Sequence, residues 1–147
     1  MEEHELQILF EWAEAYHRLG LSSGRKLTHS EVKYARDSGV KNLESVRVLE
    51  VDIMPAPPIE LLALSKQFLD ISKAAGLTLG NVIIVLKAEV GERLMRHELR
   101  HVHQTEACGS MEKFLREYVR QIFSEGYENA DFEIDARKHE LEPTSWR

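Results

Sequence analysis

Two histidines four residues apart, with a glutamate directly after the first, are the residues of this sequence best suited to chemistry. They are His97, Glu98 and His101, and they form the pattern HExxH. On a helix, residues four apart lie on the same face, so both imidazoles can reach one metal ion. Glu98 lies about 100° further round such a helix, within reach of a water molecule in an open position of the metal. The pattern therefore predicts a zinc site in which Glu98 takes the proton of the attacking water.

A third metal ligand is expected downstream, because catalytic zinc commonly binds three side chains and keeps one position for water. The segment from Phe132 to Glu140 has helical spacing, and on this helix Glu133, Ala136 and Glu140 share a face. The small Ala136 would let the segment approach the HExxH helix closely enough for Glu133 to bind the metal. We expect one Zn²⁺ ion per chain, bound by the two histidines of the pattern and by Glu133.

Other residues near the pattern are expected to take no part in the metal site. His103 is two residues from His101, so on a helix it points about 200° away and cannot share the metal. His139 and Glu140 form a second His-Glu pair without a partner histidine, and we expect them at the surface. The single cysteine, Cys108, excludes an internal disulfide framework.

The pattern HExxH followed on a later helix by Glu-x-x-Ala, here Glu133 to Ala136, is typical of gluzincins. A longer run of residues points the same way: His97–Gln104, Gly109-Ser110, Phe114 to Tyr118, Gly126-Tyr127 and Phe132 to Arg137, with Leu27-Thr28, Val46–Val48, Pro55 and Gly76–Gly80 upstream. In these segments the sequence resembles a group of small, mostly uncharacterised bacterial zincin-like metallopeptidases. The resemblance covers most of the chain after about residue 25 and is specific for a zinc site rather than for a substrate.

This resemblance implies a zinc-dependent hydrolase, a metallopeptidase that acts on a peptide or protein substrate with Glu98 as general base. In many gluzincins an Asp four residues after the glutamate ligand orients a zinc-binding histidine. Arg137 stands at that position here, and Asp135 or Asp131 is the candidate replacement. Tyr127, Arg137 and Asp135 are the further candidates for stabilising the transition state or orienting the ligands.

Tyr118 and Arg100 are the other hydrogen-bond donors near the site in sequence, and a packing tyrosine and a surface arginine are their simpler interpretations. The alternative function is a zincin-like metal-binding or interaction module with little or no catalytic activity. The chain is short and has no large substrate subdomain, which favours narrow specificity or none.

Apolar periodicity predicts an α+β fold, mainly helical, with a small sheet of two or three strands ahead of the HExxH helix. The expected helices span 3–19, ended by Gly20, then 30–37, 59–75, 92–107, 111–124 and 132–140. The expected strands span 45–53 and 81–87, with a turn at 77–80. The second strand is a run of apolar residues typical of a strand buried on both faces. In zincins the strand before the motif helix often lines the active-site cleft, so the resemblance places 81–87 at its rim. Residues 1–26 form an N-terminal helix, a candidate appendage to the zincin-like metal-binding domain of 27–147.

Composition sets the remaining expectations. The 147 residues are 43% hydrophobic and 30% charged, as in ordinary globular proteins, and the net charge of −6 gives no support to nucleic-acid binding. No apolar run approaches the roughly 20 residues of a membrane span. The N-terminus is acidic where a secretory signal would be basic, so we expect a cytoplasmic protein.

Overall fold

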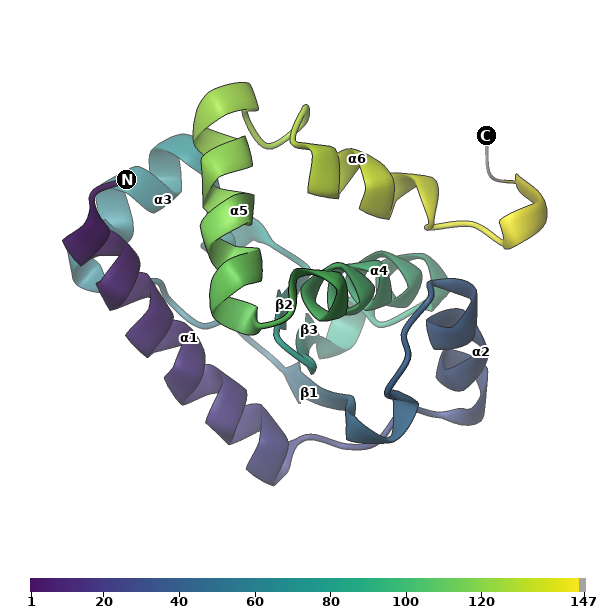
Figure 1. The fold of residues 1–147 in the computed structure, drawn as a ribbon. Coiled ribbons are helices and arrows are strands. Elements are labelled where there is room, and N and C mark those ends of the chain that lie inside the picture. The colour runs from purple at the N-terminus through teal and green to yellow at the C-terminus, as the bar shows by residue number, and fades with distance from the viewer. Residues whose placement is uncertain (146–147) are drawn as a thin grey trace.

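The structure is a computed structural model that describes residues 1–145, and in this range six α-helices surround one three-stranded sheet (Figure 1). The helices are α1 (Glu3–Ser23), α2 (His29–Asp37), α3 (Leu62–Phe68), α4 (Glu92–Cys108), α5 (Met111–Glu125) and α6 (Asp131–Lys138). The strands are β1 (Arg47–Val51), β2 (Gly76–Leu79) and β3 (Val82–Leu86). The mainly helical α+β fold and the small sheet ahead of the HExxH helix are therefore confirmed. No helix in the described range is both long and apolar enough to cross a membrane.

The sheet has the order β1-β3-β2, with β1 parallel and β2 antiparallel to the central strand. Successive β3 side chains enter two cores: Val82 and Ile84 pack on the α1 side, and Ile83 and Val85 pack on the α4 side. The prediction of a strand buried on both faces is thus confirmed. Its predicted place at the rim of a cleft is wrong, because β3 is paired on both edges. The antiparallel strand β2 takes the outer place instead, and the predicted turn at 77–80 is wrong.

The first helix runs past its predicted stop. Gly20 lies inside α1 because it packs directly on the sheet: a Cβ atom there would lie 2.2 Å from Cγ1 of Val82. Leu6, Phe10 and Ala13 of the same helix are buried in one core with Val82. Helix α1 therefore contributes to the main apolar core, while the boundary predicted at residue 26 remains a prediction.

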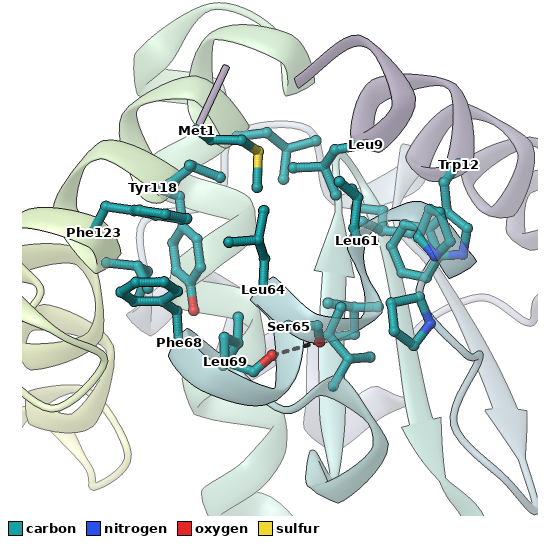
Figure 2. Close-up of a pocket in the computed structure, with 18 residues that line it drawn as sticks. Met1, Leu9, Trp12, Leu61, Leu64, Ser65, Phe68, Leu69, Tyr118 and Phe123 are labelled. Carbon is teal, nitrogen blue, oxygen red and sulfur yellow. Dashed lines mark hydrogen bonds between the residues drawn. The ribbon is translucent and has the colours of Figure 1, made fainter. Parts of the chain in front are cut away.

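The single helix predicted for 59–75 is broken into shorter pieces. Leu62–Phe68 forms an α-helix, Ile59–Leu61 and Ile71–Lys73 form 3-10 turns, and Leu69 between them is extended, with φ −156°. Polar side chains bind the backbone where the helix stops: the Ser65 hydroxyl donates to the Leu69 carbonyl at 2.8 Å, and Asp70 accepts from the Ser72 amide at 3.1 Å. Such local hydrogen bonds compete with helix formation. Helix α3 and its flanks form one wall of an apolar pocket, into which Leu64 points (Figure 2).

The opposite side of the sheet is covered by α4 and α2, which a buried arginine joins. Arg96 is 1% exposed and bonds Asp37 of α2 at 2.8 Å and Glu92 of α4 at 2.9 Å. Its guanidinium also lies over the Tyr34 ring, 4.5 Å from the ring centroid. These contacts fix the position of α4 without involving any residue of the HExxH pattern.

The outer edge of β1 is closed at one point by Arg25. The backbones of Arg25 and Val48 exchange two hydrogen bonds of 2.8 Å. The Arg25 guanidinium binds Glu31 and Glu50, each at 2.7 Å. Glu31 also forms a capping box with Thr28 at the start of α2.

Candidate metal centre

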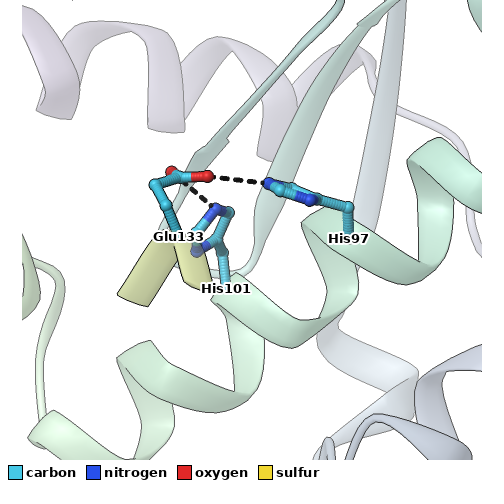
Figure 3. A group of neighbouring side chains, drawn as sticks. All are labelled: His97, His101 and Glu133. Atoms are coloured by element: carbon cyan, nitrogen blue, oxygen red, sulfur yellow. Dashed lines mark hydrogen bonds and ion pairs between the residues drawn. The ribbon is translucent and has the colours of Figure 1, made fainter. Parts of the chain in front are cut away.

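The three side chains predicted to bind a metal lie together between α4 and α6 (Figure 3). The Nε2 atom of His97 is 3.0 Å from Oε1 of Glu133, and the Nε2 atom of His101 is 3.1 Å from Oε2 of the same carboxylate. One possible ligand atom from each residue lies within 4.8 Å of the other two. The cluster is largely buried, with Glu133 only 2% exposed. These residues could therefore hold a metal ion.

Each histidine has a hydrogen-bond partner on its second ring nitrogen. Nδ1 of His97 lies 2.8 Å from Oε2 of Glu140, and Nδ1 of His101 lies 2.7 Å from Oε1 of Gln104. An acceptor at Nδ1 places the proton of a neutral imidazole there and leaves the Nε2 lone pair free for a metal. Both lone pairs then face Glu133, so two imidazole nitrogens and a carboxylate form a donor set that suits zinc and several other divalent ions.

The residues that orient the histidines differ in part from those expected. Glu140, expected at the surface, is the partner of His97, and the neighbouring His139 is buried, so the surface prediction is wrong for this pair. Asp135 supports His101 indirectly. It accepts a hydrogen bond from Gln104 at 2.8 Å, and Gln104 contacts Nδ1 of His101. Arg137 donates to the carbonyl of Glu128. A signal for Glu140 was present in the sequence, since it shares a helical face with Glu133.

Helix α6 is placed by polar side chains of its neighbours rather than by a cap of its own. The residue before it, Ala130, cannot cap, and Gln121 of α5 accepts from the Phe132 amide at 2.8 Å. Gln104 of α4 donates to the Phe132 carbonyl at 3.0 Å. The Tyr118 hydroxyl donates to Oε2 of Glu133 at 2.6 Å. These bonds fix the helix that carries Glu133, and the helical spacing of the sequence did not predict the part that the two glutamines play.

Close packing completes the approach of the two helices. Ala136 is fully buried, as expected for the residue that lets α6 approach α4. Arg100 of α4 binds Asp135 of α6 at 2.7 Å and the Ser38 carbonyl at 2.8 Å, so it links the two helices and α2. His103 is turned away, with Nδ1 3.0 Å from the Gly39 carbonyl, in agreement with its exclusion from the metal site.

The electrostatics of the cluster favour an ionised carboxylate on Glu133 and protonated imidazoles on His97 and His101. Burial lowers the pKa of His97, but the bond to Glu133 and the charges of Glu98 and Glu133 raise it more, so its pKa is about 9. The same balance raises the pKa of His101. Burial raises the pKa of Glu133, but its hydrogen bonds to both histidines lower the pKa by more than burial raises it. The pKa of Glu133 therefore lies far below its ordinary value. A metal cation between these groups would take the place of the protons on the imidazoles.

Glu98 lies beside the cluster with its own support. Its Oε1 accepts from the Thr78 hydroxyl of β2 at 2.8 Å. On the other side is Gly76, where a Cβ atom would lie 3.0 Å from both Cδ and Oε2 of Glu98. Glu98, the three cluster residues and Tyr127 line one pocket of about 80 Å³. The residue expected to act as general base and the expected ligands therefore share one pocket.

Two tyrosines at this pocket have pKa values raised by their surroundings. The Tyr118 hydroxyl is bound to Glu133, and burial and the negative charge of Glu133 raise its pKa well above the ordinary value. The pKa of Tyr127 is raised by the same two causes, burial first. Both side chains therefore keep their protons at neutral pH and can donate hydrogen bonds.

Comparison of the chain with models of known protein families, with curated proteins and with solved structures finds no match. The assignment of the site therefore depends on its own geometry and on the resemblance described for the sequence.

Proposed function

We propose that this protein is a zinc-dependent hydrolase, specifically a metallopeptidase that cleaves a peptide or protein substrate. The observation that carries the proposal is the position of the Glu133 carboxylate. It comes from a different helix, yet it lies 3.0 and 3.1 Å from the Nε2 atoms of His97 and His101. The buried carboxylate of Glu98 lines the same pocket. A cluster that only stabilised the fold would not need this fourth group.

His97, His101 and Glu133 would hold the zinc ion, which when bound polarises a carbonyl group and lowers the pKa of water. Glu98 accepts the proton of the attacking water. Thr78 holds Oε1 of this carboxylate, and Oε2, beside Gly76, is the oxygen that we assign to the proton transfer. Tyr127 lines the pocket with a protonated hydroxyl, so we assign to it the stabilisation of the oxyanion that develops on the substrate.

Strand β2 supports a peptide as the substrate. It is an outer strand of the sheet, and Gly76, Leu77 and Thr78 line the pocket that contains Glu98. An extended peptide can add to the outer edge of a strand through backbone hydrogen bonds. A peptide bound in this way would lie along the pocket, with its backbone carbonyls close to Glu98.

The first test is metal content, measured by elemental analysis of purified protein loaded with zinc and then desalted. We expect about one zinc per chain for the wild type, and loss of zinc in His101→Ala and Glu133→Ala. Two matched controls should retain zinc: His103→Ala, on the same helix but bonded to Gly39, and Glu128→Ala, exposed ahead of α6. A wild type that cannot be loaded with zinc would contradict the metal site.

The second test separates an enzyme from a metal-binding module. Glu98→Gln should retain one zinc per chain while peptide cleavage falls by about 10²–10⁴-fold, since only proton transfer is removed. Gly76→Ala should also retain zinc and lower cleavage, because the added methyl group crowds Glu98. Zinc binding without cleavage by the wild type would instead favour the module with little or no catalytic activity.

A further inference from the structure

An apolar pocket of about 100 Å³ lies next to the metal pocket, on the side of α1, α3 and α5 (Figure 2). Leu61, Leu64 and Phe68 form one wall, and Leu9 and Trp12 of α1 form another. Its lining is almost entirely carbon, and it contains none of the four site residues His97, Glu98, His101 and Glu133. The fold therefore has an apolar pocket that the proposed chemistry leaves unused.

The two pockets share a wall. Leu69, Ile71, Leu77, Leu115 and Tyr118 line both of them. Tyr118 makes the connection direct, because its side chain lines the apolar pocket while its hydroxyl bonds Glu133 at 2.6 Å. A group in the apolar pocket would thus be about one side-chain length from the proposed metal ligands.

The few polar groups at this pocket are already bound. The Ser65 hydroxyl donates to the Leu69 carbonyl, the Trp12 indole donates to the Ala56 carbonyl at 2.8 Å, and the Tyr118 hydroxyl is held by Glu133. A polar or charged group entering the pocket would lose its hydration without gaining these partners. An apolar group makes no hydrogen bonds with water, so its entry would not carry this cost.

The volume sets the size of the occupant. About 100 Å³ is of the same order as the roughly 150 Å³ apolar cavities of engineered proteins that stay dry and bind benzene. This is room for one large side chain and too little for a long acyl chain.

We propose that this pocket receives one large apolar side chain of the peptide substrate, of the Leu, Met or Phe class, from a residue next to the bond that is cleaved. The assignment rests on the proposed hydrolase function. The pocket confers specificity, because replacing such a side chain by Ala would remove several buried methylene groups. The expected preference is at least 10-fold in kcat/KM, the usual minimum for the loss of one such group.

The test is digestion of a mixed peptide library by the zinc-loaded wild type, with the residues on both sides of each cut identified by mass spectrometry. We expect Leu, Met and Phe to be enriched at one position beside the cut. Leu64→Trp, which fills the pocket, should shift the preference toward Ala and Gly. Leu64→Ala, which enlarges it, should shift the preference toward Trp, so a failure of one variant to fold leaves the other informative. Leu62→Trp is the matched control, on the same helix but exposed and not in the lining.

A binding measurement on the metal-free protein tests the pocket without catalysis. Benzene should bind the wild type and Leu62→Trp, seen as changes in methyl NMR signals, and should not bind Leu64→Trp. If benzene does not bind, if the cuts show no apolar preference, or if Leu64→Trp leaves that preference unchanged, the pocket assignment is overturned while the hydrolase stands. If the zinc-loaded wild type cuts no peptide, the hydrolase and the substrate assignment are overturned together.

Discussion

The helices on the two faces of the sheet are held in place by different kinds of contact. On the side of α2 and α4, a chain of buried or half-buried charges joins the helices: Arg96 to Asp37, and Arg100 to Asp135 of α6. On the side of α1, α3 and α5 the buried contacts are mainly apolar and leave the pocket of about 100 Å³, while the Arg116–Glu3 ion pair that joins α1 and α5 is exposed. The metal cluster lies where these two sides meet.

This difference matches what each side has to do. Hydrogen bonds and ion pairs are directional, so the charged side can fix the angle at which an imidazole or a carboxylate points. Apolar contacts carry no direction, and small gaps among them can accept a range of groups. We infer that the polar side sets the positions of the proposed metal ligands and that the apolar side accommodates the proposed substrate.

The largest expected effect is the loss of the buried cation on the polar side. Arg96→Met should lower the free energy of unfolding by about 3 kcal/mol, because it leaves Asp37 and Glu92 without their partner and removes the contact with Tyr34. Urea unfolding followed by circular dichroism measures this loss. Lys33→Met removes the other, exposed partner of Asp37 and should cost no more than about 0.5 kcal/mol. Equal effects of the two substitutions would show that burial of Arg96 does not matter.

The next effect concerns the orientation of a ligand. Glu140→Ala removes the acceptor at Nδ1 of His97 and should weaken zinc binding by about 10–100-fold, with the fold intact. Competition with a chromophoric chelator measures the change. Glu142→Ala, two residues further and exposed, should leave the affinity unaltered. Unchanged affinity in Glu140→Ala would mean that the contact does not orient the histidine.

On the apolar side, Gly20→Ala should destabilise the protein by about 1–2 kcal/mol. The added methyl group would overlap with Val82, and the cost of overpacking exceeds the gain of about 1 kcal/mol in helix propensity. Thermal unfolding measures the effect, and Leu19→Ala, on an exposed neighbour in the same helix, should have a smaller one. If Gly20→Ala raised the melting temperature, α1 would not be packed closely against β3.

The smallest effect is a dependence on pH. Burial raises the pKa of Asp37, but hydrogen bonds from Lys33 and Arg96 lower it more, so its folded pKa is below the ordinary value. A lowered folded pKa contributes stability that is present above the unfolded pKa of about 3.9 and is lost as the pH falls through the folded pKa. Asp37→Asn should therefore be less stable than wild type at about pH 6, and the difference should shrink below about pH 4.

The control for this pH dependence is an exposed carboxylate. Asp52 is 83% exposed in its side chain, and among residues 1–145 its one ion pair, with Lys87, is 3.8 Å long. Asp52→Asn should show little difference from wild type at any pH. A deficit of Asp37→Asn that persisted unchanged to about pH 2 would show that its carboxylate charge is not the source of the stability.

Local patterns were enough to predict the parts of the structure that depend on one segment. The spacing of His97 and His101 and the apolar run of β3 each specify a local geometry, and each was predicted. Glu133 was also found, because its helix carries the small residue that close packing requires. Apart from Glu133, whose contact with His97 spans 36 residues, the residues that specify each of these features lie within one segment of the chain.

The parts that were missed depend on contacts between segments distant in sequence. Strand β2 exists because it pairs with β3, and its residues 77–79 were taken for part of a turn. Gly76, the first residue of this strand, makes room for Glu98. The helix predicted for 59–75 has suitable apolar spacing, but Ser65 and Asp70 bind the backbone and end it early. Glu140 was expected at the surface although it shares a helical face with Glu133, because its contact with His97 joins residues 43 positions apart.

The closed edge at β1 has a consequence for how molecules of this protein meet one another. A sheet can add a foreign strand only at an outer edge, and an open edge is a site of self-association. Here Arg25 blocks β1 at Val48, which leaves the four residues of β2 as the more open edge. Gly76, Leu77 and Thr78 of this strand also line the pocket that contains Glu98, so a second copy pairing there would cover that pocket. Aggregation through the sheet and access of the proposed peptide substrate would therefore compete for the same backbone groups.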